Sequence, residues 1–78
     1  MAARERDAQE VETRGPIALG AFLKVCGAAS TGGHAKLMVQ QGDVRVNGAA
    51  ETHRGRRLVA GDVVAVAGRE FRVCFSAT

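Results

Sequence analysis

Hydrophobic residues in the first half of the chain recur every three or four positions, the spacing of one face of an α-helix. A first helix is predicted over residues 18–26, with Lys24 on its exposed side and Gly27 as the residue that ends it. Its apolar face consists of Leu19, Phe22, Leu23 and Cys26. A helix of this length has only two to three turns, so its stability must come from packing.

A second helical repeat follows after a short break. Ser30 or Thr31 is expected to cap this helix, which runs through about Gln41 and ends at Gly42. Its apolar face consists of Ala35, Met38 and Val39. Together the two repeats predict a compact pair of helices.

After Gly42 the pattern changes from helical spacing to alternation. A strand is predicted over residues 44–46, with Arg45 pointing away from its two valines. Asn47-Gly48 is typical of a type I′ hairpin turn, which needs positive φ at both central residues, so a strand should return through about Glu51.

The remainder of the chain repeats short β-type segments. Further strands are predicted at 58–59, 63–67 and 70–75, with turns at Gly61-Asp62 and Gly68-Arg69. The predicted fold class is therefore α+β, with two short N-terminal helices packed on a small twisted antiparallel sheet of about four to five strands.

The N-terminal segment lacks a clear period. Residues 1–15 are predicted to be a mobile tail, with a short edge strand at Val11 and Thr13 as the alternative, and residues 16–76 form a single domain. No apolar run approaches the roughly 18 residues that a membrane span needs, and the first ten residues lack the apolar segment of a secretion signal. We expect a cytoplasmic protein that has no membrane partner.

Composition argues against catalysis and bound cofactors. The 46% of hydrophobic residues are mostly Ala and Val, with no Trp or Tyr, which gives no indication of a deep cavity for a small-molecule substrate. Cys26 and Cys74 fall on different elements, so no disulfide is expected, and the ligands for a metal site are lacking. His34 and the other acid–base candidates lie at turns or exposed positions without a paired nucleophile, so no catalytic residue is assigned and no enzyme is predicted.

Charge is distributed unevenly along the chain. Residues 1–14 hold three arginines and four acids, a balance of −1, whereas residues 15–78 hold eight basic residues and four acids, a balance of +4. A basic domain favours an anionic partner through diffuse attraction. Solubility alone is the other explanation for such a balance.

The start of the second helix is the first candidate site. The first turn of a helix leaves backbone N–H groups unpaired, and glycines at positions 32 and 33 would let a phosphate approach Thr31, with Lys36 one turn further on. His34 on the same turn could stack on a base or bond a phosphate. Alternatively, the glycines make a tight turn between helices and His34 is an ordinary exposed side chain.

A cluster of arginines after the hairpin is the second candidate. Arg54, Arg56 and Arg57 fall within four residues, and guanidinium groups suit bidentate contact with phosphates. Arg45 on the preceding strand could contribute. A solvated charge run, partly neutralised by nearby acids, is the ordinary alternative. Asn47 is expected to serve the turn, although its amide could also reach a base edge or a 2′-hydroxyl.

Taken together, these motifs resemble a known family. The segment FLKVCGAASTGGHAKLMVQQGDVRVNG, followed by ETHRGRRLVAGDVVAV, is similar to the S4 RNA-binding domain, named after protein four of the small ribosomal subunit, and most like its small stand-alone bacterial members. The resemblance covers about residues 17–73. It implies the alpha-L motif, in which two helices on a small sheet present a basic face to structured RNA.

By matching positions, the resemblance places Thr31, Lys36, Arg45, Asn47 and the loop 54–57 on or near that face. Many family members carry Ser-Arg at the start of the second helix where this chain has Thr31-Gly32, so the arginine's contact cannot be transferred.

The expected partner is structured RNA, a stem or stem-loop of ribosomal or transfer RNA. The protein is expected to contact the RNA backbone and to recognise its shape, and a ribosomal subunit is a candidate host. All three phenylalanines fall on predicted core faces, which argues against stacking on single strands. The alternative function is a protein-interaction module that docks an acidic partner through the same loop or through the C-terminal hairpin edge. A monomer is expected rather than a dimer.

Overall fold

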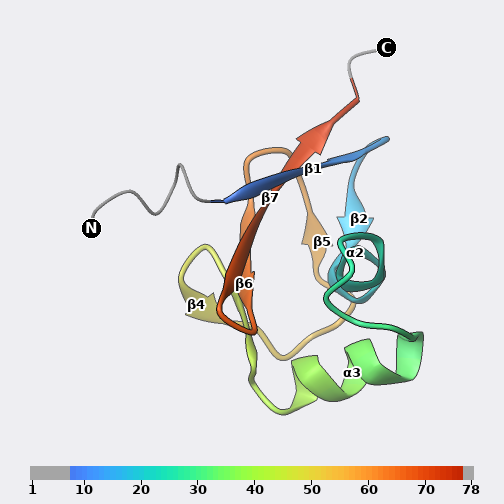
Figure 1. Ribbon diagram of the computed structural model, residues 1–78, viewed down its shortest axis with the longest axis vertical. Coiled ribbons are helices and arrows are strands. Elements are labelled where there is room, and N and C mark those ends of the chain that lie inside the picture. The colour runs from blue at the N-terminus through green and yellow to red at the C-terminus, as the bar shows by residue number, and fades with distance from the viewer. Residues whose placement is uncertain (1–7, 77–78) are drawn as a thin grey trace.

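The computed structural model describes residues 8–76 and shows two helices packed on one side of a sheet (Figure 1). The helices are α2 (Leu19–Val25) and α3 (Gly32–Gln40). The strands, in chain order, are β1 (Gln9–Thr13), β2 (Ile17–Ala18), β3 (Val44–Val46), β4 (Ala49–Ala50), β5 (Arg57–Leu58), β6 (Val63–Val66) and β7 (Arg69–Phe75). The predicted α+β class is confirmed.

The main sheet has the strand order β1-β7-β6-β3-β4 and is mixed. The pairs β3–β4, β3–β6 and β6–β7 are antiparallel, as predicted, but β1 lies parallel to β7. The prediction of an all-antiparallel sheet is therefore wrong at this edge, because β1 and β7 come from opposite ends of the chain and are not joined by a hairpin turn. β1 takes up residues 9–13 of the predicted tail, including the alternative strand positions Val11 and Thr13, while residues 1–7 of that tail lie outside the described residues.

The strand predicted at 58–59 does not join the main sheet. It is β5, it begins one residue earlier, and it pairs with β2 in a separate two-stranded sheet, with Ile17 opposite Leu58 and Ala18 opposite Arg57. The sequence pattern predicts no strand just before α2, where β2 lies. Strands of only two residues have too short a sequence pattern to be recognised, so the pairing of β2 with β5 was not predicted.

Both helices begin and end close to the predicted residues. Gly27 and Gly42 follow the two helices with φ of +84° and +79°, the left-handed conformation in which glycine has no steric cost. Asn47 and Gly48 have φ of +53° and +88°, which confirms the expected turn between β3 and β4. The last hairpin turns one residue earlier than predicted, at Ala67-Gly68, where alanine adopts φ of +53°.

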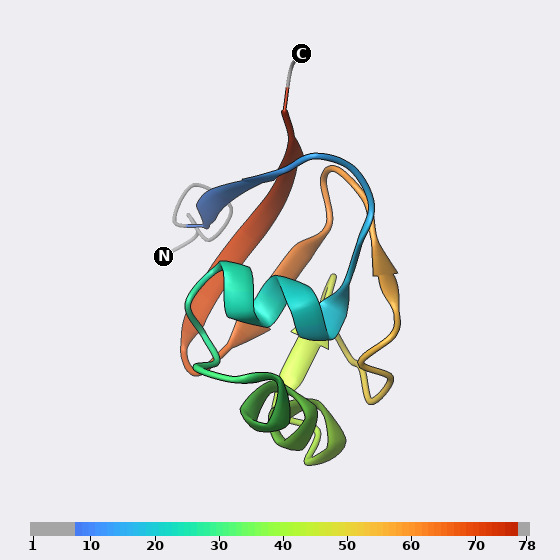
Figure 2. The same cartoon turned by 90° about the vertical axis from the view of Figure 1, so that its right-hand side faces the viewer.

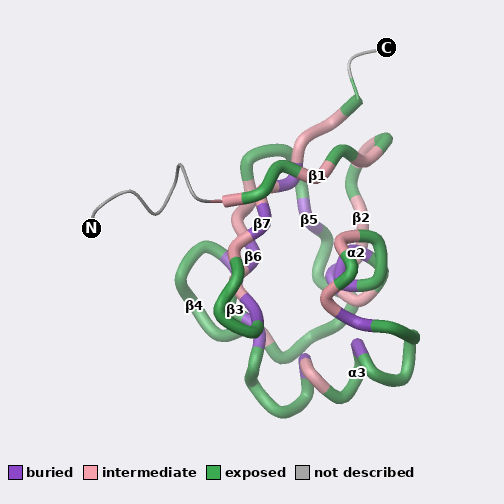
Figure 3. Tube along the Cα trace, in the orientation of Figure 1, coloured by how far each residue is buried: buried purple, intermediate pink, exposed green. Residues whose placement is uncertain are grey.

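The core lies between the helices and the main sheet, as the buried segments in Figure 3 show. The largest buried side chains include Phe22, Phe71 and Leu58, each fully inaccessible to solvent, while Phe75 is only partly buried. Both cysteines are free, and burial raises the pKa of the Cys26 thiol, which disfavours the reactive thiolate. Within residues 8–76 there is no helix with the length and apolar character needed to cross a membrane.

Candidate nucleic-acid interface

The basic loop is attached to the N-terminal end of α2 through its backbone. Ala18, the N-cap residue, makes no side-chain cap, and the first N–H groups of the helix are instead paired with loop carbonyls. The Leu19 N–H donates to the Arg56 carbonyl at 2.8 Å, and the Gly20 N–H donates to the Arg54 carbonyl at 2.9 Å. Figure 2 shows this loop beside the beginning of α2. The helix therefore holds the loop while the arginine side chains stay at the surface.

This attachment creates an open pocket of about 450 Å³ between α2, the start of α3 and the loop, which we call the basic pocket. It is lined by Ala18, Gly20, Ala21, Lys24, Gly32, Arg54 and Gly55. Lys24 and Arg54 are exposed, and neither forms an ion pair within the part of the chain that the structure describes. The pocket therefore has two cations, five small residues and no acid in its lining.

The start of α3, at the rim of the basic pocket, has reciprocal capping hydrogen bonds. The Thr31 hydroxyl oxygen accepts from the His34 N–H at 3.0 Å, and His34 Nδ1 accepts from the Ser30 N–H at 3.2 Å. In this arrangement the neutral imidazole carries its proton on Nε2, which leaves one donor on the ring. Thr31 and His34 thus order the first turn, and their predicted contacts with RNA stay predictions.

Lys36 lies on the same side of α3 as the basic pocket. It is four residues after Gly32, and residues four apart are neighbours on a helix surface. Its side chain is exposed, whereas Ala35 and Val39 face the core. Lys36 therefore continues the positive charge of the basic pocket along α3.

Arg56 differs from the other two loop arginines because it is paired. Its Nη1 donates to Glu51 Oε1 at 2.9 Å, and the other oxygen of Glu51 accepts from the backbone N–H of His53 at 3.2 Å. The hydrogen bond from Arg56, followed by the one from His53, lowers the pKa of the Glu51 carboxyl, so this carboxylate is held ionised. Arg56 therefore orders the loop. Arg57 lies on β5, exposed and without an ion pair inside residues 8–76.

Both ends of the Asn47 amide are occupied inside the protein. Its Nδ2 donates to Asp62 Oδ1 at 3.0 Å, and its Oδ1 accepts from the Val63 N–H at 2.9 Å. The second Asp62 oxygen accepts from the Val59 N–H at 2.9 Å. Asn47 thus connects the β3–β4 turn to the turn before β6, and this structural role explains why an asparagine suits the position. Both carboxylate oxygens of Asp62 accept hydrogen bonds in this network, and Asp62 forms no ion pair with the loop arginines within residues 8–76.

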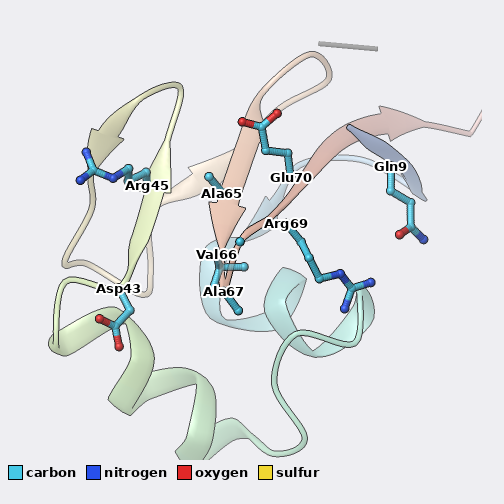
Figure 4. A pocket seen from close by; sticks show the side chains of 9 residues that line it. Gln9, Asp43, Arg45, Ala65, Val66, Ala67, Arg69 and Glu70 are labelled. Atoms are coloured by element: carbon cyan, nitrogen blue, oxygen red, sulfur yellow. The ribbon is translucent and has the colours of Figure 1, made fainter. Parts of the chain in front are cut away.

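Arg45 lies apart from the basic pocket. It points away from the buried Val44 and Val46 and lines a second open pocket, of about 660 Å³, which we call the mixed pocket (Figure 4). The mixed pocket is lined by Gln9, Asp43, Arg45, Ala65, Val66, Ala67, Gly68, Arg69 and Glu70. Its two arginines are accompanied by two acids, and Arg69 lies over the Phe71 ring at 4.9 Å. The predicted joint contribution of Arg45 with the arginine loop is therefore not supported by the geometry.

The structure thus brings Arg54 together with the start of α3 and separates Arg45 from both. It also adds Lys24, which the sequence analysis noted only as an exposed helix residue. The available signal was that Gly20 and Ala21, one turn before Lys24, leave an unobstructed helix face. The arginine loop reaches that helix face through the contact between Gly20 and Arg54, and local sequence patterns do not predict a contact between residues so far apart.

Comparison with known proteins identifies the family. The family model of the S4 domain matches residues 10–74. The chain belongs to the S4 domain family. This agrees with the resemblance found in the sequence, which covered about residues 17–73, and extends it to residues 10–13 of β1.

Two curated relatives are similar over 52 residues, which is 67% of this chain. The probable ribosome maturation protein RlbA of Bacillus subtilis is 42% identical over 73% of its own length, and the putative RNA-binding protein YbcJ of Escherichia coli is 38% identical over 74% of its length. The solution structure of YbcJ, described as revealing an alpha-L motif involved in RNA binding, matches with a TM-score of 0.66 at 30% identity, covering 95% of this chain and 96% of that one. The alpha-L fold predicted from the sequence is confirmed.

Proposed function

We propose that this protein binds structured RNA, a stem or stem-loop of ribosomal or transfer RNA, through the surface formed by the basic pocket, Lys36 and Arg57. The observation that carries the proposal is the absence of acids from the lining of the basic pocket, on a domain of the S4 family. The names of RlbA and YbcJ support an RNA partner and a role in ribosome maturation. The proposal includes that the protein acts in the cytoplasm, as a monomer, and that it catalyses no reaction.

Contacts in this proposal go to the RNA backbone and its shape rather than to bases. Arginine and lysine side chains bind phosphates, and the minor groove of an RNA helix presents 2′-hydroxyls along a shallow surface. The chain has no Trp or Tyr, two of its three Phe are fully buried and Phe75 is partly buried, so none of the phenylalanines is a fully exposed platform for stacking on unpaired bases. Sequence selectivity of this domain alone is therefore expected to be low.

Ordered backbone at the loop supports the same proposal. The carbonyls of Arg54 and Arg56 are fixed on α2, and Glu51 fixes the Arg56 side chain. A loop that is already ordered loses less conformational entropy on binding than a flexible basic tail does. Arg56 acts here as a positioning residue, and Arg54 and Arg57 as the phosphate ligands.

The test is binding of the purified chain to unfractionated transfer RNA across a potassium chloride series. If about three to five phosphates are neutralised, the wild-type affinity falls steeply with salt, and Arg54→Gln with Arg57→Gln lowers both the affinity and the slope, by about 0.7–0.9 for each lost contact. Arg69→Gln removes one positive charge outside this surface and should leave the slope unchanged. Absence of binding at low salt would leave an acidic protein partner as the explanation of the basic surface.

A further inference from the structure

We propose that the basic pocket holds one phosphodiester group of the RNA backbone between Lys24 and Arg54, an inference that rests on the proposed function. It adds Lys24 as an RNA ligand and assigns the pocket a ligand of defined chemistry. The two cations come from segments thirty residues apart, and the fold places them around one small concave surface.

The lining of the basic pocket fits a small anion better than a base or a nucleoside. Five of its seven residues are glycine or alanine, so no aromatic or amide side chain is present to read a base. The remaining two are cations, and none of the lining residues is acidic. A phosphodiester is a compact monoanion whose oxygens accept from several donors at once, which suits a pocket lined by both a guanidinium and an ammonium.

Gly20 explains how the two cations are held in place. A Cβ on Gly20 would lie 3.4 Å from Arg54 Cβ and 3.6 Å from the Arg54 carbonyl oxygen, so the loop lies directly against the helix backbone. The hydrogen bond from the Gly20 N–H to that carbonyl fixes the same contact. Lys24 follows Gly20 by four residues and therefore lies next to it on the same helix face.

A substitution at Gly32 can block the proposed phosphate site in the basic pocket without changing the charge of the protein. A Cβ at Gly32 would meet no heavy atom within 4 Å, and its φ lies outside the left-handed region. A side chain introduced here therefore starts from an unobstructed Cβ at the wall of the basic pocket, and we use leucine to fill part of that pocket. Gly15 has the same two properties but does not line the basic pocket, so Gly15→Leu is the matched control.

The experiment measures the affinity for unfractionated transfer RNA and its salt dependence for the 78-residue chain and five variants. Lys24→Gln should lower affinity by roughly three- to tenfold and the slope by about 0.7–0.9, and Gly32→Leu should lower both although it changes no charge. Arg69→Gln and Gly15→Leu should leave the slope at the wild-type value. Lys24→Arg, which keeps the charge, should restore most of the affinity, and thermal melts establish that each variant folds.

The inference is overturned if the wild type binds but Lys24→Gln behaves like Arg69→Gln, or if Gly32→Leu behaves like Gly15→Leu. In that case the proposed function stands whenever Arg54→Gln with Arg57→Gln still lowers the slope. If the wild type shows no salt-dependent binding, the proposed function fails and the inference fails with it.

Discussion

The basic pocket and the mixed pocket contain the same number of cations but differ in their acids. Lys24 and Arg54 line the first with no acid among its lining residues, whereas Arg45 and Arg69 line the second with Asp43 and Glu70. Side-chain charge in the lining is thus +2 in one pocket and zero in the other, although the mixed pocket is the larger. The number of arginines on a surface is therefore a poor guide to its net charge unless the neighbouring acids are counted as well.

The two pockets also differ in how their walls are held. The wall of the basic pocket depends on backbone hydrogen bonds between α2 and the loop, whereas the wall of the mixed pocket is the β6–β7 hairpin and its turn at Ala67-Gly68. Substitutions that act on one wall should leave the other unchanged, because the two are built from different segments.

The largest difference in RNA affinity is expected when one positive charge is reversed in each pocket. Arg54→Glu is expected to weaken transfer-RNA binding by roughly ten- to hundredfold near physiological salt, because it removes a proposed phosphate ligand and adds a repulsive charge. Arg69→Glu makes the same change in charge and is expected to cost about threefold or less through diffuse attraction alone. Filter binding or fluorescence anisotropy measures both. Equal losses would mean that RNA does not distinguish the pockets.

Removal of the α3 cap should have the next largest effect. Thr31→Ala leaves the His34 N–H without its acceptor and is expected to lower the free energy of unfolding by about 1 kcal/mol. For a domain of this size that corresponds to roughly 4–8 °C in the melting temperature. Thr31→Ser keeps the hydroxyl and should retain most of the stability. A melting temperature unchanged by Thr31→Ala would contradict the capping role.

Neutralising the acids of the mixed pocket should make the two pockets more alike. Asp43→Asn with Glu70→Gln raises the side-chain charge of that lining from zero to +2. We expect RNA affinity to rise by about two- to fivefold at low salt, since added positive potential strengthens nonspecific attraction. Glu10→Gln with Glu12→Gln, on β1, is the control for total charge. A gain above tenfold would indicate that the mixed pocket is itself a strong RNA site.

The smallest expected effect concerns the turn of the mixed pocket. Ala67 has φ of +53°, a region that is unfavourable for alanine and better tolerated by asparagine. Ala67→Asn should raise the free energy of unfolding by about 0.5 kcal/mol and leave RNA binding unchanged, as urea denaturation and anisotropy would show. Lower RNA affinity of this variant would contradict the separation of the two pockets.

Local chemistry accounts for what could be predicted from the sequence. The ends of both helices, the Thr31 cap of α3, the Asn47-Gly48 turn and the alternation of β6 and β7 depend on residues close in the chain, and these predictions were confirmed. The parallel β1–β7 pair and the β2–β5 pair join distant segments, and no local pattern encodes their register. For the same reason Arg45 was grouped with the arginine loop, although alternation along β3 directs its side chain away from the core side on which the helices lie.

The most direct test of the account is a map of the RNA contact by two-dimensional ¹H–¹⁵N NMR. The labelled protein would be titrated with unfractionated transfer RNA at low salt, and the backbone amide shifts followed. The account predicts that the largest changes fall on Gly20, Gly32 and Gly55 in the basic pocket. Largest changes at Ala65, Gly68 and Glu70 in the mixed pocket would contradict it.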